Sequence, residues 1–159
     1  MNSCLYLKAD GELPQVSLED LKRFHKDLIC LTGGADGPVG CLLRAGQAPA
    51  AEALMQQFSE IYGDRLYVEL QRHPGETGLP EAERLTEAGF IEFAYRMDLP
   101  LVATNDVYFP KPDMYEAHDA LICISEGAYV DQQAPRRRLS AQHYFKTPQE
   151  MVTLFADLP

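Results

Sequence analysis

Glu69 and His73 are the residues of this sequence whose types and spacing best suit metal chemistry. They stand four residues apart in the run ELQRH, at the end of a strand-like run that closes at Leu70. A carboxylate and an imidazole are both ligands of zinc and manganese, and a loop that begins after Leu70 would bring the two toward one ion. Taken alone, this pair of residues is more commonly explained as a solvated carboxylate and a surface imidazole.

Asp106 is the third candidate ligand, and it ends the polar triplet Thr104-Asn105-Asp106. Because Asp and Asn after a strand usually cap turns, the triplet by itself favours a structural role. A Gly-rich run, TGGADGPVG, occupies residues 32–40. Its spacing fits neither the dinucleotide fingerprint nor the P-loop, and no lysine follows it, so a tight turn from strand to helix is favoured.

The remaining histidines carry weaker signals. His118 lies inside a predicted helix, where a surface or packing role is the simpler interpretation, and His25 and His143 have no partner pattern. The spacing supports no Ser/His/Asp or Cys/His constellation and no pair of carboxylates for acid-base catalysis.

Alternating strands and helices must position these residues. Apolar runs predict strands at residues 28–31, 66–70 and 101–103, the first of them buried. Three- and four-residue apolar steps predict helices at 48–62 and 80–97. Their apolar stripes are Ala51, Leu54, Met55, Phe58 and Ile61 in the first, and Leu85, Phe90, Phe93, Ala94 and Met97 in the second. This order is typical of right-handed crossovers onto a parallel sheet. Because the chemistry of such sheets collects where strands stop, the two polar strand ends predict two walls of one site.

The pattern changes after Asp106. Residues 112–124 predict a helix that Gly127 stops, with one apolar side formed by Met114, Ala117, Leu121 and Ile124. Residues 129–140 are polar and predict a long excursion, in which Arg136, Arg137 and Arg138 are interpreted as a solvated loop.

Capping residues predict two further helices. Thr147, Pro148 and Glu150 form an N-cap, a first-turn proline and a capping-box acid before the last helix. Ser17 opens a helix near the start, where the one other apolar piece is Cys4–Leu7. With so few strands, we expect an excised fragment, whose open sheet edge invites pairing with a second copy as a homodimer.

Composition limits the function classes. The 159 residues, 46% of them apolar, suffice for one domain with a core, and the net charge of −10 disfavours direct sequence-independent binding of DNA. Four widely spaced cysteines (Cys4, Cys30, Cys41 and Cys123) favour buried free thiols and a cytoplasmic location. Neither a membrane span nor a secretory signal is predicted.

Several runs, in this order, carry a family resemblance: LICLTGGADGPVG, YVELQRH, LPLVATNDVYF, EAHDALICI and YFKTPQEMVTLFADLP. From residue 28 to residue 159 the chain resembles the later part of the PHP (polymerase and histidinol phosphatase) domain of bacterial DNA polymerase III alpha subunits. The resemblance implies a partial distorted β/α barrel, with only its later parallel strands alternating with helices. It places the PHP portion at residues 1–128, and residues 129–159 as an excursion and terminal helix leading toward the polymerase core.

The resemblance also implies ligand positions for a cluster of up to three metal ions. Glu69 and His73 match ligands in the ELQRH motif, and Asp106 matches the aspartate of a D-x-H strand end. Two positions depart from the pattern: Tyr108 stands where metal-binding members have histidine, and Gly34 where many have cysteine. A neutral phenol with an ordinary pKa of about 10 is a poor ligand, and glycine offers none.

These departures favour a degenerate metal site. We expect at most weak Zn or Mn at Glu69, His73 and Asp106, no catalytic residue in this segment, and a structural or partner-binding role. The resemblance implies a parent DNA-directed DNA polymerase that uses Mg²⁺ elsewhere, with polymerase III holoenzyme subunits, such as the proofreading subunit, as partners. The alternatives are a metal-dependent PHP phosphoesterase or 3′-5′ exonuclease, and a plain interaction module unrelated to replication.

Overall fold

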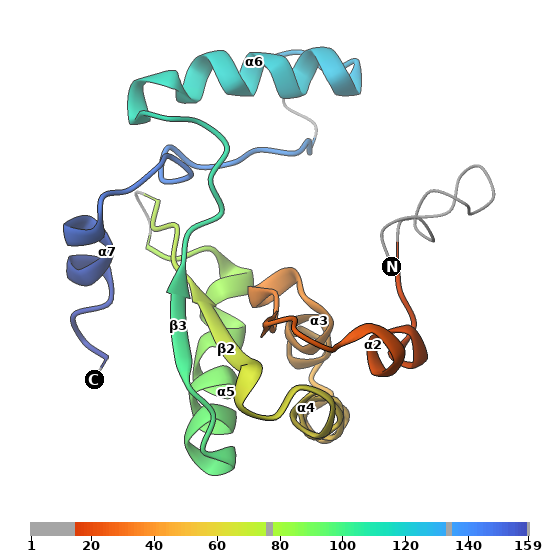
Figure 1. The fold of residues 1–159 in the computed structure, drawn as a ribbon. Helices are drawn as coiled ribbons and strands as arrows, with labels where there is room; N and C mark the ends of the chain where they lie inside the picture. The colour runs from red at the N-terminus through yellow and green to blue at the C-terminus, as the bar shows by residue number, and fades with distance from the viewer. Residues whose placement is uncertain (1–14, 76–77, 133–134, 159) are drawn as a thin grey trace.

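Three parallel strands form the centre of the computed structural model, which describes residues 15–75, 78–132 and 135–158 (Figure 1). The strand order is β1-β2-β3, with β1 at Cys30–Leu31, β2 at Leu66–Gln71 and β3 at Leu101–Thr104. In the register of β2 and β3, Leu70 lies opposite Ala103. The sheet formed by these described strands is not closed, which confirms the predicted α/β class and partial barrel.

Helices connect the strands; two of them lie where the apolar periodicity predicts, and one, at residues 38–44, was not predicted. Two of them, α3 and α4, lie between β1 and β2, and α5 lies between β2 and β3. The helices are α2 (Leu18–Phe24), α3 (Pro38–Arg44), α4 (Ala48–Tyr62), α5 (Glu81–Met97), α6 (Tyr115–Glu126) and α7 (Pro148–Leu154), and the 3₁₀ turns are η1 (Gly34–Asp36), η2 (Gly63–Arg65) and η3 (Pro112–Met114).

The apolar core lies between β2 and helices α4 and α5. Four of the five residues in the predicted stripe of α4 are buried, among them the fully inaccessible Met55, and Leu54 is half-buried. One residue of the stripe predicted for α5 was placed wrongly, since 48% of Leu85 is exposed. The core cluster consists of Val39, Ala51, Met55, Phe58, Ile61, Tyr62, Leu66, Val68, Leu70, Phe90, Phe93, Ala94 and Phe155.

Capping boxes begin the first and last of the described helices. Ser17 accepts a hydrogen bond from the backbone of Asp20, whose side chain accepts one in return from the backbone of Ser17. Thr147 and Glu150 form the same reciprocal pair at α7, with 2.7 Å between the Thr147 amide and the Glu150 carboxylate. Both predicted helix starts are therefore confirmed, because each box satisfies backbone donors that the first turn leaves unpaired.

Helix α6 and the segment after it form a separate layer beyond the ends of the strands (Figure 1). The predicted apolar side of this helix was assigned wrongly: 62% of Leu121 and 76% of Ile124 are exposed, whereas Asp119, Ile122 and Cys123 are buried. Gly127 ends the helix in the left-handed conformation, as predicted. Because α6 packs against residues after β3 and against its own return segment, its inner side differs from the one that apolar spacing indicates.

The first predicted strand was also wrong in its burial and length. Only Cys30–Leu31 form β1, and 40% of Leu28, 68% of Ile29 and 44% of Leu31 are exposed. Among the described strands, β1 has β2 as its single neighbour. Its apolar residues consequently lie at an edge of the described sheet rather than in its centre.

The described cysteines are free, as predicted, but they differ in burial. Cys123 is buried and Cys30 is half-buried, whereas Cys41 is exposed on α3, which corrects the expectation of burial there. The predicted apolar piece Cys4–Leu7 lies outside the described residues. Within residues 15–75, 78–132 and 135–158, the structure has no helix that is long and apolar enough to span a membrane.

Candidate functional site

The ends of β2 and β3 bring the predicted polar residues together. Because the two strands are parallel and Gln71 lies opposite Thr104, the residues that follow each strand emerge at the same edge. The Thr104 hydroxyl donates to a carboxylate oxygen of Glu69 at 2.5 Å, and the Gln71 amide donates to both side chains at 3.3 Å. Hydrogen bonds therefore cross directly from one strand end to the other.

Glu69 is buried, with 7% of the residue exposed, and the Gly-rich turn holds it. Its second carboxylate oxygen accepts a hydrogen bond from the Gly33 amide at 2.9 Å, and its own amide donates to the Thr32 hydroxyl at the same distance. Gly33 has a φ of +85°, a conformation that favours glycine. The turn therefore serves as a backbone donor to Glu69.

Gly34 lies against the side chain of Gln71. A Cβ at position 34 would come within 2.6 Å of the Gln71 amide oxygen. The Gln71 side chain thus fills the space that a cysteine side chain at this position would need. Gly34, which offers no ligand, therefore leaves the space that the Gln71 side chain occupies.

His73 is engaged at both ring nitrogens and is almost wholly buried. Its Nδ1 lies 2.7 Å from one oxygen of Glu83, and its backbone amide donates to the other oxygen at 2.8 Å. Its Nε2 accepts a weaker hydrogen bond from the Asp106 amide at 3.3 Å. This network assigns the ring proton to Nδ1, because Nε2 must be the acceptor. Glu83, in the first turn of α5, is a site residue that the sequence patterns missed.

His143 is the second site residue that the sequence missed. Its ring stacks on His73 with 3.9 Å between the centroids and 9° between the planes. Burial lowers the pKa of His143, and the neighbouring His73 lowers it further. The excursion after α6 thus returns to the strand ends, which no local pattern around His143 indicates.

A pocket of about 330 Å³ lies at these strand ends, and we call it the strand-end pocket. Asp106 and Glu83 both line it, and Asp106 is exposed. Glu69 is not among the lining residues, because its carboxylate turns toward the glycine turn. The lining consists of Ala35, Asp36, Gln71, His73, Pro80, Ala82, Glu83, Asp106, Arg138, Leu139, Ser140 and His143.

Tyr108 contacts aromatic rings and an arginine rather than the candidate ligands. Its ring meets His118 and His143 edge-on, with centroids 5.5 and 5.9 Å away. Its hydroxyl accepts a hydrogen bond from Arg137 at 3.2 Å, and the same guanidinium lies over the ring. The phenol at this position therefore packs against rings and binds an arginine.

In the described part of the chain, the candidate ligands are poorly arranged to bind a metal ion. No group of three or more His, Cys, Asp or Glu side chains there is arranged to hold an ion. Glu69 and His73 direct their donor atoms to protein partners, and Asp106 contributes its amide rather than its carboxylate to His73. In the structure, these hydrogen bonds instead connect the glycine turn, β2, β3 and α5.

Arg72, between the predicted ligands, fastens the last helix to the strand end. Its guanidinium forms paired hydrogen bonds with Glu87 of α5 and with Asp157, donates to the Leu154 carbonyl, and lies over the Phe155 ring. The hydrogen bonds to Glu87 and Asp157 raise the pKa of Arg72. The sequence shows Arg72 between the two predicted ligands, but it does not show which distant residues bind the guanidinium.

One residue of the arginine cluster, Arg136, departs from the solvated loop that the sequence predicts, whereas Arg137 and Arg138 are exposed as expected. Only 3% of the Arg136 side chain is exposed, and it forms two hydrogen bonds of 2.6 and 2.7 Å with Asp119 of α6. Arg137 binds Tyr108, and Arg138 donates to the Val130 carbonyl. The prediction failed at Arg136 because the buried carboxylate that pairs with it, Asp119, lies on a helix earlier in the chain.

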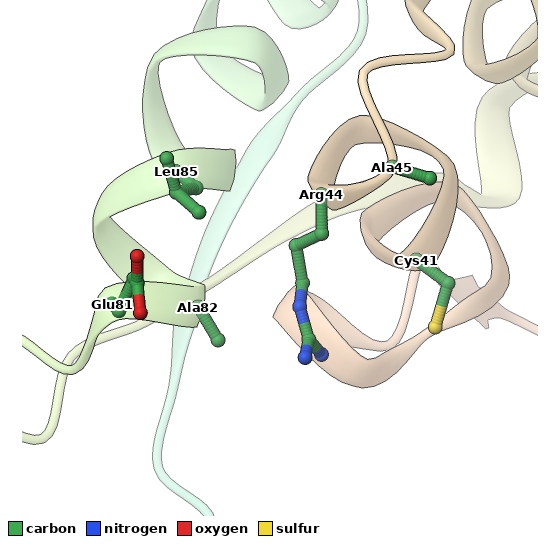
Figure 2. A pocket seen from close by; sticks show the side chains of 6 residues that line it. All are labelled: Cys41, Arg44, Ala45, Glu81, Ala82 and Leu85. Atoms are coloured by element: carbon green, nitrogen blue, oxygen red, sulfur yellow. The ribbon is translucent and has the colours of Figure 1, made fainter.

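A larger groove of about 510 Å³ lies between the last turn of α3 and the beginning of α5 (Figure 2). Arg44, Glu81 and the exposed Cys41 line it, together with apolar side chains. The Arg44 guanidinium is paired with Asp36 at 2.6 Å. Size alone does not make this groove a candidate site, because its cation is already neutralised and its thiol stands alone.

Comparison with known proteins agrees with the resemblance. A family model described as PHP domain matches residues 1–73, which includes Glu69 and His73. The chain is 48% identical to DNA polymerase III subunit alpha of Caulobacter vibrioides over all of its length, and 43% identical to that of Rickettsia bellii over 91%. The corresponding protein of Pseudomonas aeruginosa is 40% identical over 87% of the chain.

The chain spans only 11 to 14% of the length of these three relatives. For the Caulobacter vibrioides relative, the similarity nevertheless covers the whole of this chain. The chain is therefore similar, over all of its length, to a segment of DNA polymerase III alpha subunits, and its first 73 residues match the PHP domain.

Proposed function

We propose that this segment is a structural PHP region of a replicative DNA polymerase, with a degenerate metal site. The observation that carries the proposal is that the metal-competent atoms are already hydrogen-bonded to other groups of the protein. Both carboxylate oxygens of Glu69 and both ring nitrogens of His73 already have protein partners. Binding an ion would have to break these hydrogen bonds in a buried site, where unpaired polar groups are costly.

Tyr108 and Gly34 support the same proposal. Each stands where the resemblance implies a ligand, and each has a different task in the structure: Tyr108 binds Arg137, and Gly34 makes room for Gln71. The contacts that replace the ligands join segments far apart in the sequence. We infer that the hydrogen-bonded network stabilises the strand ends in place of metal ions.

In this proposal the polymerase chemistry resides elsewhere in the full-length protein, where carboxylates would hold Mg²⁺. The acidic charge of −10 fits a segment that contacts other polymerase III holoenzyme subunits, such as the proofreading subunit, rather than DNA itself. Its role would be to hold the arrangement of the polymerase and to bind a partner.

Metal analysis of the full-length protein tests the degenerate site. After mild dialysis from zinc- or manganese-containing buffer, we expect less than one retained ion per chain, and the same content in a Glu69→Gln variant. This substitution keeps the shape of the side chain while removing its charge. Retention of two or three ions per chain, lost in the Glu69→Gln variant, would contradict the proposal.

One observation favours a second candidate, a metal-dependent phosphoesterase or 3′-5′ exonuclease. The strand-end pocket is open to solvent, and the exposed Asp106 carboxylate lies in its wall near His73. A bound zinc or manganese ion would there activate water for attack on phosphate. Manganese-dependent 3′-5′ exonuclease activity that is abolished by Asp106→Asn, and retained in an Asp113→Asn control on η3, would establish this candidate over the first.

A further inference from the structure

The outer side of α6 carries a continuous apolar row, which we call the α6 seam: Met114, Ala117, Leu121 and Ile124. These residues follow one another at steps of three, four and three, which is the spacing of the positions that meet when two helices pair. All four are exposed, and 62% of Leu121 and 76% of Ile124 are accessible to solvent. Scattered exposed apolar residues are ordinary, but a continuous row of them on one helix is typical of an interaction surface.

The α6 seam faces away from the rest of the described structure. The buried residues of α6 are Asp119, Ile122 and Cys123, which helical periodicity places on the opposite side. No described residue of α6 belongs to the apolar core cluster. In Figure 1, no helix or strand lies beyond α6 on the side away from the sheet. The seam is therefore a helix face without a partner in this segment.

The α6 seam contains no charged residue, although the chain carries a net charge of −10. At about 100° per residue, the exposed Glu116 and Glu126 of the same helix lie more than a quarter turn away from the centre of the seam. Lys111 and Asp113, which precede the helix, are of opposite sign. Charge therefore does not select the occupant, and the surface that the seam matches is another apolar helix face.

The small area of the α6 seam limits which occupants can remain bound. A large apolar side chain buries about 100 Å², and the three in the seam are partly exposed, so the seam presents about 200 to 300 Å². A pair of α6 helices from two copies would close by two-fold symmetry, with Leu121 against the second copy's Ala117. It would bury only about 400 to 600 Å² in total, whereas a specific interface between separate molecules needs about 1,000 Å².

A helix of the same polypeptide needs far less area to stay in contact. Segments that are linked in one chain meet at effective concentrations of up to about the millimolar range, so a contact of a few hundred Å² can persist. The chain spans at most 14% of the three relatives compared above. A full-length protein of that length would therefore contain a large amount of polypeptide outside this segment, which could supply such a helix.

We propose that the α6 seam packs against an amphipathic helix from the remaining part of the full-length polymerase subunit. This inference rests on the proposed structural role of the segment, and it names the surface that performs that role. Because α6 has 12 residues and is about 18 Å long, its partner needs about two heptads of apolar positions. A large side chain of the partner would lie opposite Ala117, the small residue of the seam. In the 159-residue chain by itself, the seam faces solvent.

Thiol accessibility in the full-length protein tests this contact. Leu121→Cys places a thiol in the seam, and mass spectrometry follows its labelling by a maleimide at that position. We expect labelling at least tenfold slower than in Val152→Cys, a control on α7 where the native side chain is similarly exposed in this segment (65% against 62%). Unfolding in urea should make the two rates equal. Equal rates in the native protein would overturn the inference.

Photo-crosslinking of the full-length protein identifies the occupant without truncating Leu121. With benzoylphenylalanine in place of Ile124, we expect crosslinks within one molecule, to a peptide outside the 159 residues of this segment. Crosslinks to a second copy, or slow labelling that is lost on dilution, would assign the seam to self-association and overturn the inference. Protection that appears only after another holoenzyme subunit is added would overturn it as well.

The metal analysis fails independently of this inference. Two or three retained ions per chain would contradict the degenerate metal site, but they would not change the labelling rates of Leu121→Cys and Val152→Cys. Fast labelling of Leu121→Cys in a protein without retained metal would overturn the helix contact alone.

Discussion

The sheet with α4 and α5 and the layer formed by α6 and its return segment are stabilised in different ways. Large apolar side chains such as Met55 and Phe90 are buried between α4, α5 and β2. The α6 layer instead depends on polar contacts, among them Arg136 with Asp119 and Lys146 with Asn105, and it leaves Ile124 exposed. The difference teaches that apolar periodicity locates a helix in both regions but finds its buried side only where apolar packing provides the stability.

Truncation of one apolar residue in each region gives the largest contrast. Met55→Ala is expected to lower the free energy of unfolding by about 2 to 5 kcal/mol, because it opens a cavity in the core. Ile124→Ala is expected to change it by no more than about 0.5 kcal/mol, since the side chain is 76% exposed. Urea unfolding followed by circular dichroism measures both. A comparable loss in the two variants would show that the outer side of α6 is buried in solution.

Breaking the buried ion pair of the α6 layer should cause the second-largest loss of stability. Arg136→Met leaves the buried Asp119 carboxylate without its partner and is expected to destabilise the protein clearly, whereas Arg136→Met with Asp119→Leu should recover most of the loss. Thermal unfolding and protease resistance of the segment after Gly127 are the measurements. Arg137→Met, which alters an exposed neighbour, serves as the control. If it matched Arg136→Met, the buried pair would not be the cause.

A smaller effect is expected where β3 meets the return segment. Asn105→Ala removes hydrogen bonds to the Tyr144 carbonyl and to Lys146, each worth about 1 kcal/mol, and leaves a buried ammonium group with fewer partners. Hydrogen exchange of residues 143–146 should accelerate while exchange in α4 stays unchanged. Asn105→Asp keeps an acceptor for Lys146 and should show a weaker acceleration. Equal acceleration in α4 would mean that the two regions unfold together.

The smallest effect is a dependence on pH at α7. Hydrogen bonds from the Tyr144 hydroxyl and from Thr147 lower the pKa of Glu150 from 4.5 to about 2. The folded state therefore binds fewer protons than the unfolded state between these values, so this contribution to stability is complete above pH 4.5 and is lost as the pH falls toward 2. Tyr144→Phe should raise the pKa of Glu150 and reduce the acid sensitivity, as measured by NMR titration. An unchanged pKa would rule out the hydroxyl as the main cause.

The two strand ends show how far the candidate site follows from the sequence. The predicted runs at 66–70 and 101–103 have clear apolar patterns, and parallel pairing places the residues after them at one edge. Glu83 and His143 were missed because their contacts with His73 depend on the course of α5 and of the return segment. Whether Glu69, His73 and Asp106 bind metal stays a prediction.

By itself, the sequence determined the order of the three strands and of the two long helices between them, the helix starts at Ser17 and Thr147, and the similarity to DNA polymerase III alpha subunits. These properties depend on local spacing, on capping residues and on motifs that neighbouring residues carry. Only the tertiary structure decided that Arg136 is buried, that the predicted side of α6 faces solvent, and that Glu69 and His73 are bound by protein groups. The physical reason is that burial and hydrogen-bond partners come from residues distant in the chain, which local periodicity does not encode.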